Sequence, residues 1–303
     1  MTTFTPKRIL CPVDFSEQSG MALRVAGTLA LVFGSEVTVL HAQRLEAPVY
    51  FTAAQTKALE TQLRRSARSA KEHISEFAQE RLPPGVACQP LLVESEPVSA
   101  ILKIHRAIGG DLIAMGTHGR GGLARVRLGS VAESILHEVD APLLTVGPGM
   151  KVPPAVGPIH RVLCPVNYMA SAQRAMGYAA SLAEKTGAEL TVAHIDEAPE
   201  GGDSQDSLRQ LCDWVPAAVR TRCAVREVVR QGSAAAQIIQ EAEESRADLV
   251  VIGAQPRNLL GWILLGSTTE LVIRSSLCPV LTVIEKKTPT ADLRVEEAAH
   301  AHV

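Results

Sequence analysis

The chain alternates between two kinds of hydrophobic pattern. Short runs of apolar and β-branched residues are typical of buried strands, and longer segments in which apolar residues recur every three or four positions are typical of amphipathic helices. Their regular alternation favours an α/β fold in which helices cover both faces of a parallel sheet. In the first half of the chain, the predicted strands are Arg8–Val13, Glu36–Ala42, Ala87–Val93, Asp111–Met115 and Pro142–Val146.

Glycine and proline indicate where the intervening helices end. Gly34 follows the first amphipathic segment, and glycine readily adopts the left-handed conformation of a helix C-terminus. Pro83 ends the second segment because proline cannot continue a helix. The predicted helices are Ser16–Phe33, Ala54–Glu80, Val98–Ile108 and one that begins at Ser130.

The second half of the chain repeats the first. Residues Arg8–Asp14 (RILCPVD) match Arg161–Asn167 (RVLCPVN), and Asp111–Gly116 (DLIAMG) match Asp248–Gly253 (DLVVIG). The spacing between the two motifs is shorter in the second copy, so the duplication has lost residues in its middle. A stretch rich in proline and glycine separates the copies, as expected of a domain boundary. We predict domains at residues 1–148 and 158–285, followed by a charged tail at residues 286–303.

The second copy has the same order of predicted elements. Its second helix is shorter, about Asp203–Thr221, and Pro216 is expected to kink it or divide it in two. Its strands are predicted near Val162, Leu190, Val225, Leu249 and Val280.

Composition and charge exclude some classes of protein. Apolar residues make up 46% of the chain and charged residues 20%, which is too apolar for a disordered protein. The formal net charge is −2 and aromatic residues amount to 3%. Neither a basic surface nor a set of aromatic platforms is therefore available for nucleic acid, and we expect no nucleic-acid partner.

The sequence also carries indications of location. The N-terminal residues lack the apolar run of a secretion signal, and no uncharged stretch reaches the roughly 18 residues of a membrane span. The six cysteines form no C-x-x-C pair, so we expect small buried side chains in a reducing compartment. We expect a cytoplasmic protein with no membrane partner.

A glycine motif follows the fourth strand of the first copy. Gly116, Gly119, Gly129 and Ser130 have the spacing G-x2-G-x9-G-S, between a strand end and a helix start. Glycine lets a ligand approach the backbone closely, and a helix N-terminus offers unpaired N–H groups to a phosphate. The intervening bases are Arg120, Arg125 and Arg127. The alternative is that the two first glycines only form a turn and that Ser130 is an ordinary N-cap.

Asp14 follows the first strand. In a doubly wound sheet the first and fourth strands flank the point where the strand order reverses, and ligands bind there. Asp14 could therefore contact the same ligand as the glycine motif. The alternative is a structural role, because Asp14 and Glu17 have the spacing of a reciprocal cap at a helix start.

These residues resemble the universal stress protein family, specifically its tandem two-domain members. The resemblance rests on Pro12-Val-Asp14, on Met115–Gly122 (MGTHGRGG) and on Leu128–Val131 (LGSV), and it covers nearly the whole chain. It implies two tandem flavodoxin-like domains, of the adenine nucleotide alpha hydrolase type. Each would be an open five-stranded parallel sheet of order 3-2-1-4-5 with helices on both faces.

The resemblance also implies an ATP site in the first domain. Asp14 and the backbone of Val13 and Ala42 would face adenine, residues 115–119 would line the ribose and phosphates, and the start of the fourth helix would hold the phosphates. Magnesium or manganese would accompany the nucleotide; no protein residue is predicted as a metal ligand or as a catalytic group. The candidate nucleotide-binding residues are Pro12, Val13, Asp14, Ala42, Met115, Gly116, Gly119, Arg120, Gly129, Ser130 and Val131.

The second copy departs from this motif. Asn167 replaces the acid, and Pro256 replaces the second glycine, which removes an N–H and restricts the turn. We expect its site to be weak or empty for ATP. This copy could instead serve in dimerisation or bind something else.

The predicted function is that of an ATP-binding universal stress protein, a nucleotide-dependent regulator that acts through conformation or an unknown regulatory protein partner. The alternatives are a slow ATPase or phosphotransfer enzyme and a nucleotide-independent interaction scaffold. An enzyme would need a positioned base, and Asp14 and His118 are weak candidates. His41 and His194 occupy matching strand ends and are expected to be structural.

The fifth strands would leave exposed edges at Val146 and Val283 unless they pair. In the family such strands pair between domains. The resemblance therefore implies a pseudo-dimer within the chain, which would associate further into a homodimer.

Overall fold

The computed structural model describes residues 2–43, 68–119, 128–150, 157–197, 204–254, 257–259, 262–264 and 266–284. Some residues named above lie outside these ranges: the predicted site residue Arg120, the loop bases Arg125 and Arg127, Pro256, and the tail from residue 286. Among the described residues, no helix has the length and apolar character that crossing a membrane requires.

The first copy folds as the hydrophobic pattern predicts. Strand ends differ from the predicted ones by one residue at most, and the segment at residues 68–79, within the predicted second helix, is helical. The elements are β1 (Arg8–Pro12), α1 (Glu17–Phe33), β2 (Glu36–Gln43), β3 (Cys88–Glu94), α3 (Pro97–Ile108), β4 (Leu112–Gly116), α4 (Ser130–Glu138) and β5 (Leu143–Val146).

The second copy repeats this order with two local changes. Pro216 divides the predicted second helix into α6 and α7, as expected, and caps the second piece. A short antiparallel hairpin, β10–β11, was not predicted from the sequence. The elements are β6 (Arg161–Val166), α5 (Ala170–Thr186), β7 (Glu189–Asp196), α6 (Ser204–Trp214), α7 (Ala217–Arg220), β8 (Val225–Gln231), α8 (Ala234–Glu244), β9 (Leu249–Ala254), β10 (Arg257–Leu259), β11 (Trp262–Leu264), α9 (Ser267–Ser275) and β12 (Val280–Ile284).

Local chemistry accounts for the helix ends. The Ser16 side chain accepts a hydrogen bond from the Ser19 N–H at the start of α1, and this satisfies one of the free donors of the first turn. At the other end, Gly34 is left-handed, with φ of 65°, as predicted. Gly109 ends α3 in the same way, with φ of 58°.

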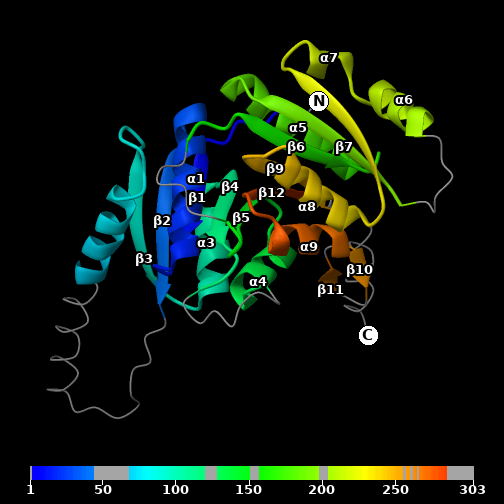
Figure 1. Ribbon diagram of the computed structural model, residues 1–303. Helices are drawn as coiled ribbons and strands as arrows, with labels where there is room; N and C mark the ends of the chain where they lie inside the picture. The colour runs from blue at the N-terminus through cyan, green and yellow to red at the C-terminus, as the bar shows by residue number, and fades with distance from the viewer. Residues whose placement is uncertain are drawn as a thin grey trace, which may run out of the picture.

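The two domains share one ten-stranded sheet. The strand order is β3-β2-β1-β4-β5-β12-β9-β6-β7-β8, so each domain has the expected parallel order 3-2-1-4-5 (Figure 1). β5 and β12 pair antiparallel at the centre, with Leu144 opposite Leu281. The predicted pairing of the fifth strands between domains is therefore confirmed.

Side chains alternate between two helical layers. Ile9 and Cys11 of β1 face the layer that contains α1 and α5, whereas Leu10 faces the layer that contains α3 and α4. Cys11 and Cys164 occupy matching buried positions, and burial raises the pKa of the Cys164 thiol to about 12. The expectation of buried cysteines is wrong for Cys88, which is exposed on the edge strand β3.

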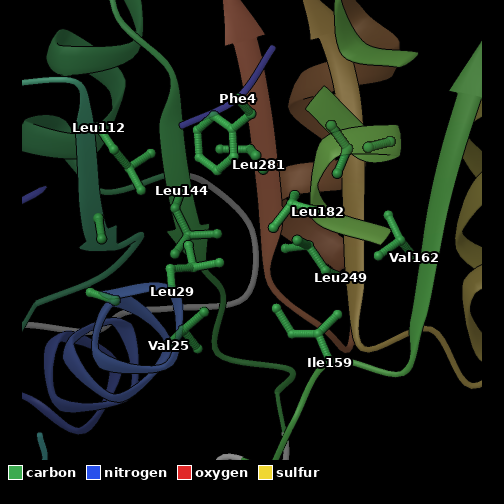
Figure 2. Close-up of a cluster of buried hydrophobic side chains, with 14 of the residues drawn as sticks. Phe4, Val25, Leu29, Leu112, Leu144, Ile159, Val162, Leu182, Leu249 and Leu281 are labelled. Carbon is green, nitrogen blue, oxygen red and sulfur yellow. The ribbon is translucent and has the colours of Figure 1, made fainter. Parts of the chain in front are cut away.

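The apolar core is continuous across the domain boundary. Figure 2 shows Leu144 of β5 and Leu281 of β12 beside Phe4, a residue of the N-terminal segment. Phe4 is 3% exposed, and its ring lies 5.3 Å from that of Phe33 in α1 and 4.9 Å from that of Tyr178 in α5. The N-terminal segment therefore packs against helices of both domains.

The two outer edges of the sheet oppose further strand addition. β3 carries Pro90, which has no N–H to donate to another strand. β8 carries Arg226 and Arg230, whose guanidinium groups pair with the buried carboxylate of Glu241. Because prolines and charges protect sheet edges, a homodimer would need a different surface.

The position of Phe4 generates a stability prediction. Replacing Phe4 with alanine should lower the free energy of unfolding by about 3–5 kcal/mol, because it leaves a cavity where the two domains meet. Urea denaturation measures this change. Thr5→Ala alters an exposed neighbour and should change the same free energy by no more than about 0.5 kcal/mol. Equal effects of the two substitutions would contradict the role assigned to Phe4.

Candidate functional site

A cavity of about 260 Å³ opens at the carboxyl ends of β1 and β4 in the first domain. These neighbouring strands lead to helices on opposite faces of the sheet, α1 and α4, which makes the gap between them the expected ligand position. Every predicted site residue that lies within the described ranges lines the cavity: Pro12, Val13, Asp14, Ala42, Met115, Gly116, Gly119, Gly129, Ser130 and Val131.

Sequence reasoning missed part of the apolar wall. Leu40 of β2 lines the cavity, as do Pro97 and Ile101 of α3. The third helix itself was predicted, and Pro97 and Ile101 are one turn apart on it. Nothing in the sequence indicated that this face of the helix reaches the end of β1. Ser19 and Ala132 complete the wall and were likewise not predicted.

Asp14 is held in a turn that leads into α1. Its Oδ1 accepts hydrogen bonds from the Ser16 backbone N–H at 3.0 Å and from the Ser16 hydroxyl at 2.6 Å. Phe15 between them has φ of 63°, a conformation that costs energy for a bulky residue. The capping alternative for Asp14 is wrong, because Ser16 is the N-cap.

The same hydrogen bonds keep Asp14 ionised. Burial favours the neutral form, yet the hydrogen bonds from Ser16, helped by Ser19, outweigh it and hold the pKa of the carboxyl below its usual value. One oxygen of this carboxylate, Oδ1, accepts hydrogen bonds from Ser16. The other oxygen, Oδ2, presents a charged acceptor. At neutral pH the cavity therefore contains one fixed negative charge from Asp14.

The loop after β4 lies close to that carboxylate. A methyl group built on Gly119 would lie 2.5 Å from Asp14 Oδ2, so a residue with a side chain would force the Asp14 carboxylate to shift. Gly116 is needed for a similar reason, since a Cβ there would lie 2.9 Å from Gln18 Cβ in α1. Close approach, rather than a left-handed turn, accounts for these two glycines.

The start of α4 is tied to the same loop. The Gly129 N–H donates to the carbonyl oxygen of Thr117 at 2.8 Å, and the Thr117 N–H donates to the carbonyl oxygen of Val146 at 2.9 Å. Gly129 is the N-cap and makes no side-chain cap, so the alternative that Ser130 caps α4 is wrong. The first residues of α4, Ser130 and Val131, line the cavity with the positive end of the helix dipole.

Histidines at matching strand ends of the two domains have backbone partners. His41 Nδ1 lies 2.8 Å from the Val13 carbonyl oxygen, and His194 Nδ1 lies 3.0 Å from that of Val166. The structural role expected of these two residues is confirmed. His118 Nδ1 lies 2.9 Å from the Thr117 hydroxyl. It therefore already shares a hydrogen bond on one side of its ring.

Metal ligands are not gathered in this part of the molecule. Within the residues that the structure describes, no group of three or more His, Cys, Asp and Glu side chains could hold a metal ion. A divalent cation at the cavity would have to be bound largely by a ligand's own oxygens, with the Ser130 hydroxyl as the nearest hydroxyl of α4.

Comparison with known proteins places this geometry in a family. The signature of the Universal stress protein family matches residues 5–147 and 158–283. A universal stress protein of Mycolicibacterium smegmatis is 27% identical over 296 residues, which cover 91% of this chain and 96% of that protein.

The fold of one solved structure agrees with this assignment. The crystal structure of a universal stress protein from Archaeoglobus fulgidus has a TM-score of 0.71 and 25% identity, and the match covers 93% of this chain and all of that one. A universal stress protein solved in complex with cAMP matches 47% of this chain and 98% of its own, with 17% identity and a TM-score of 0.36. With two tandem matches to the family signature and a relative that matches both halves, this chain belongs to the universal stress protein family.

Proposed function

We propose that the first domain binds ATP in the cavity between β1 and β4, and that the bound nucleotide regulates the protein's conformation or its choice of protein partner. One observation carries this proposal. The residues expected to contact adenine and those expected to contact phosphate come from strand ends far apart in the sequence, yet they line a single cavity.

The chemistry of the inner wall suits a purine. Leu40, Ile101 and Met115 provide an apolar surface for the flat faces of the base. Asp14 Oδ2 provides an acceptor for an exocyclic amino group, since Oδ1 already accepts from Ser16. At about 260 Å³ the cavity lies near the lower end of the range of roughly 300–1,000 Å³ typical of ligand sites. It would enclose the nucleoside and leave the phosphates at its mouth.

The start of α4 suits the phosphates. The N-terminal N–H groups of this helix and its dipole favour an anion, and Gly129 allows the backbone to approach closely. Arg120, beside Gly119 in the sequence, would add positive charge. Magnesium or manganese would arrive with the phosphates and could take the Ser130 hydroxyl as a ligand. Bound to both, the cation would neutralise part of the phosphate charge.

A regulatory role fits these contacts better than catalysis. Asp14 is a weak base, because the hydrogen bonds from Ser16 help to hold its pKa below the usual value, and the Nδ1 of His118 shares a hydrogen bond with the Thr117 hydroxyl. The nucleotide would instead connect the loops after β1 and β4 with the start of α4. By connecting these segments, bound ATP would change the surface that contacts a regulatory protein.

The nucleotide content of the purified protein tests the proposal. Denaturing the protein and separating the released small molecules should yield ATP at up to one molecule per chain, and added Mg-ATP should raise the Tm of protein stripped of nucleotide. Release of ADP alone, with turnover of added ATP, would favour the slow ATPase. No release and an unchanged Tm would overturn the proposal in favour of the nucleotide-independent scaffold.

Gly119→Pro should weaken ATP binding. Proline removes the loop N–H at this position and brings ring atoms into the space beside Asp14 Oδ2. We expect Kd to rise by about tenfold or more, equivalent to about 1.4 kcal/mol, measured by titration calorimetry. Pro256→Gly makes the opposite change at the matching position of the second domain. As a control it should leave both Kd and the number of bound nucleotides unchanged.

Asp14→Asn should change which base is preferred. The second domain shows that asparagine keeps the turn, since Asn167 Oδ1 accepts from the Met169 N–H at 3.2 Å. The variant should therefore fold, with a Tm close to that of the wild type. A carboxylate favours the amino group of ATP over the carbonyl of ITP, because it can only accept hydrogen bonds. An amide can also donate, so the ratio of the two affinities should fall by about tenfold. An unchanged ratio would remove Asp14 from base recognition.

A further inference from the structure

The second domain can be compared with the first position by position. The hydrogen-bond register between neighbouring strands shows which residues of the two domains correspond. Pro12 pairs with Leu40 between β1 and β2, and Pro165 pairs with Ala193 between β6 and β7. His41 and His194 contact matching carbonyl oxygens one residue further on. Ala42, which lines the cavity, therefore corresponds to Ile195.

Ile195 is larger than Ala42 and more deeply buried. Its side chain is 9% exposed and belongs to an apolar cluster with Ile238 of α8 and Ile252 of β9. These two residues correspond to Ile101 and Met115, the cavity wall against which we place the base. Where the first domain has a methyl group beside an opening, the second domain has a larger, buried sec-butyl group in the same cluster as the residues that correspond to that wall.

The second domain also lacks two polar groups that the first domain has at its cavity. Asn167 keeps the turn but lacks the charge of Asp14. Ala254 replaces Thr117 and has no hydroxyl. The Glu197 side chain accepts a hydrogen bond from the Ala234 N–H at 3.1 Å, at the start of α8. The start of α3 in the first domain is likewise capped by a carboxylate, since Glu96 accepts a hydrogen bond from the Ser99 N–H at 2.9 Å, so this charge does not distinguish the two domains.

We infer that each chain binds a single nucleotide, in the first domain, and that the residue at the carboxyl end of the second strand decides which domain binds. The small side chain of Ala42 leaves room for the base, and Ile195 occupies the equivalent space. This inference rests on the proposed function. The two domains would then differ in function. The first domain binds the ligand, and the second shares the sheet and the core with it but does not bind.

Transferring the second domain's residue to the first tests the inference. Ala42→Ile should fold, because the same backbone position holds isoleucine in the second domain. Titration calorimetry with Mg-ATP should give one site per chain in the wild type. In Ala42→Ile the affinity should fall by at least about tenfold, since even one extra methylene in a filled pocket is worth roughly 10-fold or more. Ala42→Ser, which adds little volume, should keep binding within about threefold of the wild type.

A matched variant keeps the test independent of folding. Ile195→Val alters the equivalent residue outside the proposed site, and it should leave the stoichiometry at one and the Kd unchanged. Circular dichroism and Tm of every variant confirm that each chain is folded.

The outcomes separate the two proposals. A stoichiometry of zero in the wild type would overturn the ATP site itself. Two sites per chain, or one site whose affinity Ala42→Ile leaves intact, would overturn the present inference while the ATP site stands. One site that is lost in Ala42→Ile and kept in Ile195→Val supports both.

Discussion

The antiparallel pairing of β5 with β12 is the interaction on which the rest of the structure depends. It joins two parallel five-stranded sheets into one. It thereby removes the edge that each copy would otherwise expose at its fifth strand. The Thr145 hydroxyl, 1% exposed, donates to the Val280 carbonyl oxygen at 3.2 Å, so the junction is satisfied by side chains as well as backbone. Leu144 and Leu281 then form one core with Phe4, and neither domain has a complete interior without the other.

This arrangement explains how a duplicated domain can change in one copy only. Both copies need the strands and helices that build the common sheet. Matching features are therefore retained in pairs: Cys11 and Cys164, His41 and His194, and the close approach of Gly116 to α1 and of Gly253 to α5. The cavity at the carboxyl ends of the strands is lined in part by core residues such as Leu40 and Ile101, and in part by Ala42, which is only half-buried. Residues there can change without cost to the fold, as Ala42 and Ile195 illustrate, because filling an opening with an apolar side chain adds burial instead of removing it.

Most of the fold and most of the candidate site could be predicted because their signals are local or repeated. Gly34 and Gly109 end helices by their own conformational freedom, and Pro216 divides a helix by its lack of an N–H. The capping alternatives were wrong because they concern choices between near neighbours, and the expected burial of Cys88 was wrong because this residue lies on an edge strand. Ser16 rather than Asp14 caps α1, and Gly129 rather than Ser130 caps α4, because the cap is selected by the angle at which the chain enters the helix.

The amino-acid sequence by itself determined the repeat, the alternation of strands and helices, and the two strand ends that carry the candidate ligand chemistry. It could do so because periodicity, caps and motif spacing act over a few residues. Only the tertiary structure decided that Pro97 and Ile101 line the cavity, that Phe4 packs against helices of both domains, and that Ile195 is buried in an apolar cluster. Each of these depends on contacts between residues far apart in the chain. Such contacts are fixed by packing once the sheet has formed, and a local pattern contains no information about which side chain will meet which.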